Sequence, residues 1–83
     1  MKLLYFAWLK QRTGVAEEEV TLPASVTDVA GLVEWLRGRG PGYAAALKNP
    51  AVIRVAVNQE YVSANHPVRP GDEVALFPPV TGG

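Results

Sequence analysis

The chain has 83 residues, of which 48% are apolar and 19% charged, and its eight basic residues balance eight acidic ones. This length supports a single small domain, and the composition excludes a disordered chain. Nucleic acid is excluded as a direct partner because the basic residues do not cluster, and the absence of cysteine excludes disulfides, thiolate metal sites and thiol nucleophiles.

The N-terminal part is expected to form a hairpin. The apolar and aromatic run over residues 2–9 predicts a strand that is followed by a turn. Residues 18–22 then alternate in polarity, which places Val20 and Leu22 on one face of a second strand. The three glutamates at 17–19 are expected to form a solvated strand start.

Residues 1–9 also resemble the basic and apolar regions of a signal peptide. The apolar run is at the short limit for such a peptide, and no small-residue cleavage site follows it. No stretch approaches the roughly 20 apolar residues that a membrane span needs. We therefore expect a cytoplasmic protein with no membrane partner.

One amphipathic helix is predicted after the hairpin. The segment Ser25-Val26-Thr27-Asp28 resembles a capping box, and Arg37 supplies a basic last turn. The apolar residues at helical spacing between them are Val29, Leu32, Val33 and Leu36. Gly38 and Gly40 predict a left-handed exit from the helix.

Shorter elements fill the second half of the chain. Residues 41–48 predict a short helical turn. Residues 52–57 alternate in polarity and predict a strand, and a brief strand follows at residues 61–62. After a loop punctuated by prolines, the final strand is predicted at residues 73–77.

This order of elements is typical of a ubiquitin-like β-grasp, an α+β fold. We expect a mixed, roughly five-stranded sheet with one main helix on one face and the last strand beside the first. A ferredoxin-like βαββαβ fold is the alternative, but its second helix would have to come from the short segment 43–47. Residues 1–77 are expected to form the domain, and residues 78–83 a flexible, extended C-terminal Gly-Gly tail.

The tail residues are suited to enter another protein. Pro78 and Pro79 lack backbone donors and favour extended geometry, so the segment is expected to leave the domain as a semi-rigid arm that reaches about 20 Å. Gly82 and Gly83 carry no side chains and can pass through a channel barely wider than a peptide backbone. The arm is therefore expected to reach the active site of a partner.

Several motifs resemble one known family. Gly71-Asp72-Glu73-Val74, leading into Phe77-Pro78-Pro79-Val80-Thr81-Gly82-Gly83, resembles the C-terminal signature of the molybdopterin synthase small-subunit family. Leu4-Tyr5-Phe6-Ala7 and Val57-Asn58-Gln59-Glu60 are also similar to that family. The resemblance covers nearly the whole chain, and the combination of a strand, Pro-Pro and terminal Gly-Gly makes it specific.

The resemblance implies a sulfur carrier rather than a catalyst on its own. It implies that Gly83 is adenylated, converted to a thiocarboxylate and used as the sulfur donor to cyclic pyranopterin monophosphate in molybdenum cofactor biosynthesis. The residues implied to thread into the partner are Gly82, Thr81, Val80, Pro79 and Pro78. The implied partners are the molybdopterin synthase large subunit, an adenylating enzyme of the ubiquitin-activating kind and a sulfur donor enzyme.

No cofactor or metal is expected on this chain. It lacks the G-x-x-x-x-G-K-[ST] loop that would hold the phosphates of ATP, so ATP is expected to be used by the activating partner.

The last strand also predicts a docking surface. Alternation places Val74 and Leu76 on the helix-covered face and leaves Ala75 and Phe77 on the opposite face, at the root of the arm. Ala75 and Phe77 are therefore candidate partner-docking residues. The alternative interpretation is that Phe77 is a partly buried aromatic residue at the end of a sheet.

Other functions would use the same tail. A sulfur carrier for thiamine or for tRNA thiolation would share the terminal chemistry, although thiamine carriers are usually shorter and lack the Phe-Pro-Pro run. A ubiquitin-like modifier would attach through Gly83 to lysines of other proteins. A plain interaction module would tolerate the loss of Gly82 and Gly83.

Overall fold

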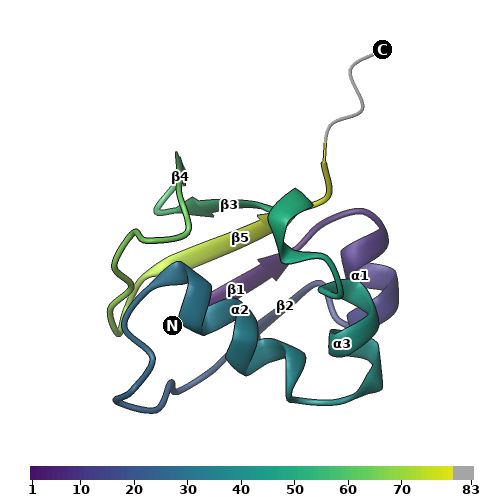
Figure 1. Cartoon of the computed structure of the whole chain (residues 1–83), viewed down its shortest axis with the longest axis horizontal. Helices are drawn as coiled ribbons and strands as arrows, with labels where there is room; N and C mark the ends of the chain where they lie inside the picture. Colours follow the sequence, from purple (N-terminus) through teal and green to yellow (C-terminus); the bar gives the residue numbers. More distant parts are fainter. Residues whose placement is uncertain (80–83) are drawn as a thin grey trace.

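A mixed five-stranded sheet forms the centre of the chain in the computed structural model, which describes residues 1–79. Its strands are β1 (Lys2–Tyr5), β2 (Glu17–Glu19), β3 (Arg54–Val57), β4 (Glu60–Val62) and β5 (Glu73–Phe77). Their order across the sheet is β2-β1-β5-β3-β4; β1 and β5 are parallel, and the other neighbouring pairs are antiparallel (Figure 1). The first and last strands lie side by side at the centre, so the predicted β-grasp is confirmed and the ferredoxin-like alternative is wrong.

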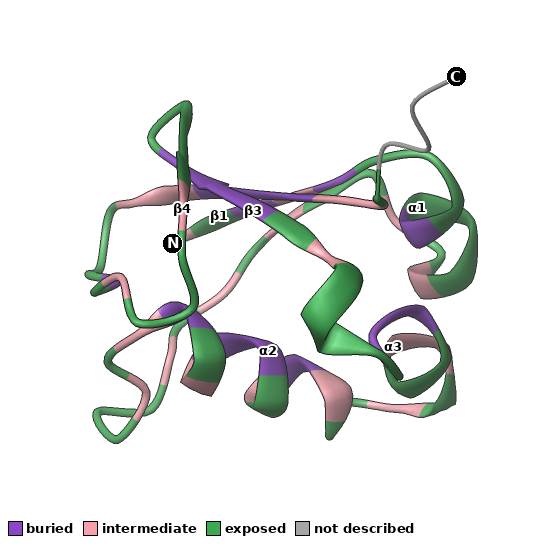
Figure 2. Ribbon diagram, turned by 45° about the horizontal axis from the view of Figure 1, so that its top comes forward, coloured by how far each residue is buried: buried purple, intermediate pink, exposed green. Residues whose placement is uncertain are grey.

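The helices pack on one side of this sheet. They are α1 (Trp8–Thr13), α2 (Val29–Arg37) and α3 (Pro41–Ala46), and a 3₁₀ turn, η1 (Pro50–Val52), leads into β3. Figure 2 shows α2 and α3 beneath the sheet, with buried positions along the side of α2 that faces it. The core between the two layers consists of Leu3, Tyr5, Leu9, Val29, Leu32, Val33, Leu36, Ala46, Leu47, Val55, Val57, Val68, Val74 and Leu76.

The α2 helix keeps its predicted anchors but begins at a different cap. All four apolar residues at helical spacing are buried, as predicted. The helix is capped by Asp28, whose carboxylate accepts a hydrogen bond of 2.8 Å from the backbone N–H of Gly31. A capping box starting at Ser25 is therefore wrong, because Asp28 is held extended by a bridge to Pro67 and the helix starts after it. The predicted left-handed exit is wrong for both glycines: Gly38 ends α2 with φ −80° and ψ −2°, and Gly40, with φ 156° and ψ 172°, is extended and precedes α3.

The first strand is shorter than its apolar run predicts. It ends at Tyr5, the chain turns at Ala7, which has φ 54°, and α1 follows where the strand was expected to continue. Leu9 is fully buried within α1. A short apolar run is compatible with either a strand or a buried helical turn. Here residues 8–13 form a helix, which allows Leu9 to be buried among the helices.

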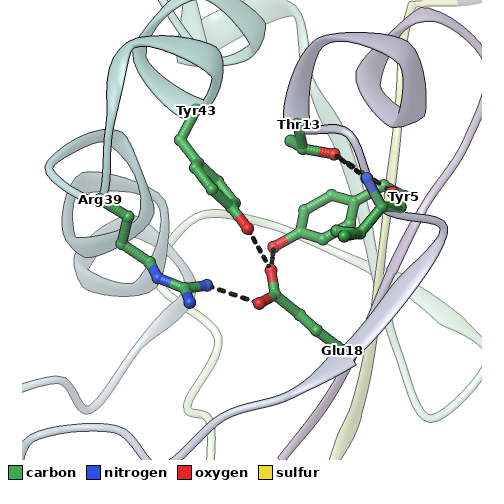
Figure 3. Close-up of polar contacts among 6 residues, drawn as sticks. Tyr5, Thr13, Glu18, Arg39 and Tyr43 are labelled. Carbon is green, nitrogen blue, oxygen red and sulfur yellow. Dashed lines mark hydrogen bonds and ion pairs between the residues drawn. The ribbon is translucent and has the colours of Figure 1, made fainter.

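A polar cluster ties the edge strand β2 to the helical layer (Figure 3). Glu18 pairs with Leu3 in the sheet, which directs its side chain to the helix-covered face. Its carboxylate accepts hydrogen bonds from the hydroxyls of Tyr5 at 2.7 Å and Tyr43 at 2.8 Å, and from Nη1 of Arg39 at 2.9 Å. The solvated strand start expected at residues 17–19 is therefore wrong for Glu18, whose side chain is only 16% exposed.

The cluster holds one negative charge among groups that stay protonated. Burial alone would raise the pKa of the Glu18 carboxyl, but the hydrogen bonds from Tyr5, Arg39 and Tyr43 together outweigh it and hold that pKa below its ordinary value. Burial and the Glu18 carboxylate raise the pKa of both tyrosine hydroxyls. Proton transfer between these groups is therefore disfavoured at neutral pH. The cluster instead contributes to stability, because it joins β1, β2 and α3.

Gly42 permits the close approach of α1 and α3. A Cβ atom at this position would collide with the carbonyl oxygen of Arg12, which belongs to the backbone of α1. Backbone cannot yield as a flexible side chain can, so a larger residue would force the two helices apart. This contact supports the segment that follows β1.

We expect Gly42→Ala to lower the free energy of unfolding by about 2 kcal/mol, because the added methyl group overpacks the contact between α1 and α3. The measurement is urea denaturation followed by circular dichroism. The control is Gly38→Ala, where the new Cβ would meet the Trp35 carbonyl oxygen at an ordinary 3.6 Å. Equal losses in the two variants would contradict the proposed collision.

We expect Glu18→Gln to lower the free energy of unfolding at pH 7 by about 2 kcal/mol, because the amide replaces a carboxylate that accepts three hydrogen bonds. The folded-state pKa of Glu18 lies below its unfolded value. Its contribution is therefore complete above the unfolded pKa of about 4.3 and disappears as the pH falls through the folded pKa. The difference in free energy of unfolding between the parent and Glu18→Gln should therefore become smaller at acidic pH.

Denaturation curves at pH 7 and at acidic pH measure this difference. The matched control is Glu34→Gln, because Glu34 is 67% exposed and pairs only with Arg37 on its own helix. A difference between parent and Glu18→Gln that is the same at both pH values would contradict the linkage.

Candidate functional site at the root of the tail

The open face of the sheet, opposite the helices, carries the predicted docking residues. Val74 and Leu76 are fully buried in the core, whereas Ala75 and Phe77 point to the other side of β5. The predicted alternation is therefore confirmed. Docking of a partner to these residues stays a prediction.

Strand register extends this surface across the sheet. Leu4, Ala75, Ala56 and Tyr61 are successive partners on β1, β5, β3 and β4, and so form one row. Phe77 pairs with Arg54 in the next row, towards the tail. We call the surface formed by these apolar side chains the open apolar face; its residues are Leu4, Phe6, Ala56, Tyr61, Ala75 and Phe77.

Three aromatic rings gather at the end of this face from which the tail leaves. The rings of Phe6 and Phe77 are stacked, with centroids 4.6 Å apart and planes at 8°, and Tyr61 lies 5.8 Å from Phe77. Phe6 is 41% exposed and Tyr61 is 65% exposed, while Phe77 between them is half-buried. Phe77 is therefore a half-buried aromatic residue at the end of the sheet, as the alternative interpretation describes, and it also lies at the centre of an aromatic patch whose other rings are exposed.

Sequence reasoning missed Phe6 and Tyr61 as members of this patch. Phe6 was included in an apolar strand, and the turn at Ala7 that ends the extended segment could not be seen in the pattern. Tyr61 was recognised only as part of a brief strand. The register of the strands is what places Tyr61 on this face. Tyr61 pairs with Ala56, and Ala56 pairs in turn with Ala75.

A backbone hydrogen bond fixes the position at which the chain leaves the sheet. The backbone N–H of Phe6 donates a hydrogen bond of 3.2 Å to the carbonyl oxygen of Leu76, which extends the pairing of β1 with β5 to the last residues of the sheet. Pro78 is half-buried and Pro79 is exposed, and neither lies in a helix or strand, as predicted. The remaining candidates, Val80, Thr81, Gly82 and Gly83, lie outside the described residues, so their threading and carrier roles stay predictions.

Other features of residues 1–79 lie away from this end of the sheet or offer no comparable chemistry. A hollow of 280 Å³ lies between the segment 20–27 and the loop 68–70, and another of 240 Å³ lies between α2 and the segment from η1 to β4. No group of three His, Cys, Asp or Glu side chains in this part of the chain is arranged to hold a metal ion. None of its helices is long and apolar enough to cross a membrane.

Comparison with known proteins gives one consistent result. The ThiS family matches residues 3–83. The molybdopterin synthase sulfur carrier subunit of Escherichia coli K12 is 40% identical over 83 residues, which are 100% of this chain and 99% of that protein.

Two solved structures share the fold. The putative molybdopterin converting factor subunit 1 from Pyrococcus furiosus has a TM-score of 0.76 and 35% identity, with 95% of each chain covered. The small archaeal modifier protein 1 of Haloferax volcanii has a TM-score of 0.74 and 28% identity, with 96% of this chain and 97% of that chain covered.

The family match and the match to the E. coli protein run through the sheet, the helices and the C-terminal motif. They confirm the family resemblance and the β-grasp that the sequence predicts. The chain therefore belongs to the ThiS family, and a curated relative that matches it over its whole length is a sulfur carrier subunit of molybdopterin synthase.

Proposed function

We propose that this chain is the sulfur carrier subunit of a molybdopterin synthase and carries sulfur as a thiocarboxylate on Gly83. The observation that supports the proposal most is the full-length match to the E. coli sulfur carrier subunit, which includes the tail residues. The exposed aromatic patch at the root of the tail gives this role a physical basis, because it offers a docking surface where the tail leaves the domain.

The chemistry requires activation by a partner. A carboxylate is a poor electrophile and must first be activated. On an adenylating enzyme, the Gly83 carboxylate attacks the α-phosphorus of ATP, which forms the acyl adenylate and releases pyrophosphate. Sulfide supplied by a sulfur donor enzyme then attacks the acyl carbon, AMP leaves, and the thiocarboxylate remains. Transfer of that sulfur to cyclic pyranopterin monophosphate, with a water oxygen taking its place, restores the carboxylate. Because activation consumes ATP, the proposal places the chain in the cytoplasm.

The domain and the tail have separate tasks in this proposal. The open apolar face docks on the large synthase subunit through Phe77 and Ala75, and the segment from Pro78 to Gly83 enters that subunit's active site. Gly82 permits the passage because it has no side chain. General acid and base groups, and the site for the pterin substrate, belong to the partner.

A second candidate function is that of a protein modifier attached through Gly83. It is supported by the similarity to the small archaeal modifier protein 1, which has the same fold at 28% identity. The two functions share the activated terminus but differ in the final acceptor. A modifier yields isopeptide adducts on lysines, whereas a carrier accumulates as the thiocarboxylate.

We expect intact mass spectrometry of the chain from its native cells to show a species heavier by the difference between one sulfur and one oxygen atom. Removal of Gly82 and Gly83 should abolish this species and the synthesis of molybdopterin, and so should one residue added after Gly83. Thermal unfolding equal to that of the parent is the control for an intact domain. Molybdopterin synthesis at the parental rate by either tail variant would contradict the carrier role, and adducts as the main product would favour the modifier.

We expect Phe77→Ala to weaken the complex with the large subunit by about tenfold to a hundredfold, because truncation removes the centre of the aromatic patch. Isothermal titration calorimetry gives the dissociation constant. The control is Leu22→Ala, which also removes a half-buried apolar side chain but packs against the core on the helix-covered side. Equal weakening by both variants would show a general loss of stability and contradict docking through Phe77.

A further inference from the structure

Charged side chains lie at both ends of the sheet, and Lys2 and Arg69 accompany the carboxylates of one end. Glu73 begins β5 and Glu60 begins β4, and register places both beside the end of β3. Asp72 adjoins them, where it accepts a hydrogen bond from Asn58. At the opposite end, Arg54 begins β3 and pairs with Phe77. The chain therefore leaves the sheet at the end that carries Arg54.

Arg54 lies beside the aromatic patch at this end, and a second guanidinium group, that of Arg12, belongs to the helix that follows Phe6. Arg54 is exposed and shares the open face with Ala56, because Val55 and Val57 point into the core. Arg12 lies on α1, with its guanidinium carbon 5.3 Å from the centre of the Trp8 ring. Trp8 is 36% exposed and follows Phe6 by two residues.

Neither of these cations has a carboxylate partner within residues 1–79, a feature that they share with Lys10, Lys48 and Arg69. Lys2 pairs with Glu17, Arg37 with Glu34, and Arg39 with Glu18. Within residues 1–79, no carboxylate lies within ion-pair distance of Arg12 or Arg54. Their charge is therefore available to a partner at the surface where the apolar face ends.

Docking through the open apolar face would take Arg54 partly out of water. Removing a charge from water is costly unless an opposite charge meets it. Arginine is enriched at protein interfaces because its planar donors match carboxylates in a two-point contact. A surface that is apolar opposite Phe77 and acidic opposite Arg54 therefore fits this end of the sheet.

We propose that Arg54, with Arg12 on α1 as a second cation, selects a protein partner whose tail-receiving surface is an apolar patch rimmed by carboxylates. The inference rests on the proposed function only for the identity of the partner, which is the large synthase subunit. The charges increase the rate of encounter and orient the tail towards the partner, while the aromatic patch supplies the lasting contact. Both the charged groups and the apolar contact area thus contribute to specificity for the partner.

The test compares two charge reversals of identical size. Arg54→Glu reverses charge at the root of the tail, and Arg69→Glu reverses it in the loop before β5, at the opposite end of the sheet. Arg69 has no ion pair within residues 1–79, so both variants change the net charge equally without breaking a salt bridge. Urea denaturation checks that both remain folded.

The association rate constant with the large subunit of the source organism is measured by stopped-flow fluorescence at several salt concentrations. For the parent, it should fall as salt rises. At low salt, Arg54→Glu should associate about tenfold more slowly and lose most of that salt dependence, while Arg69→Glu should match the parent. Arg12→Glu should show a smaller loss of the same kind.

The outcomes separate this inference from the proposed function. Tight binding by the parent with equal effects of Arg54→Glu and Arg69→Glu would overturn the inference alone, because only net charge would then matter. Failure of the parent to bind would contradict the proposed function and the inference together. Self-association of the parent that Arg54→Glu abolishes would show that Arg54 meets a carboxylate of a second copy, and would overturn the proposed partner.

A cross-link identifies the acidic rim directly. In Arg54→Lys the charge is kept and an amine is introduced, which a carbodiimide couples to a carboxylate in contact with it. Mass spectrometry of the complex should find position 54 joined to Asp or Glu of the large subunit, and Arg69→Lys should give no such product. Cross-links from position 69 but not from position 54 would overturn the proposal.

Discussion

The parallel pairing of β1 with β5 is the constraint on which the rest of the structure depends. It brings together two segments from opposite ends of the chain, with Leu3 beside Val74 and Tyr5 beside Leu76. These four side chains are almost fully buried. Parallel strands cannot be joined by a tight turn, so the intervening chain must cross over the sheet, and the helices of that crossover cover one face. The final strand is thereby held in the middle of the sheet, and the chain leaves the sheet from that strand at Pro78.

The two faces of the sheet consequently have different tasks. The helix-covered face contains the core and the Glu18 cluster, in which each carboxylate oxygen has a donor and titration near neutral pH is disfavoured. No helix covers the open face; Ala56 and Ala75 on it are buried, and the exposed rings of Phe6 and Tyr61 stand with half-buried Phe77 where β5 ends. The core is thus concentrated on one side, and the proposed docking surface lies on the other. This division leaves the open face available to a partner without exposing the core.

Much of the fold followed from local patterns, and the failures have physical causes. The bounds of β5 and the four anchors of α2 were predicted correctly, because alternation and helical spacing are strong signals when one face is buried. The end of β1 was missed, since nothing local shows that Leu9 becomes buried among the helices. Glu18 was assigned to solvent because its partners Tyr5, Arg39 and Tyr43 are distant in sequence and meet it only in the folded chain.

The candidate site was predictable in part for the same reason. Phe77 and Ala75 are neighbours on one strand, so their common face followed from alternation alone. Phe6, Tyr61 and Arg54 come from three other segments, and only strand register and ring stacking place them around Phe77. The residues of the tail belong to a family motif that is contiguous in sequence, so they can be identified without knowledge of tertiary contacts.

The central claim is that the open apolar face and the tail are the working surface of the chain. Backbone amide chemical shifts, recorded by NMR before and after addition of the large synthase subunit, test it most directly. The account predicts that the largest shifts follow Leu4, Phe6, Ala75, Phe77 and the residues after them, with little change along α2. Shifts concentrated on the helix-covered side, with the open apolar face unchanged, would contradict it.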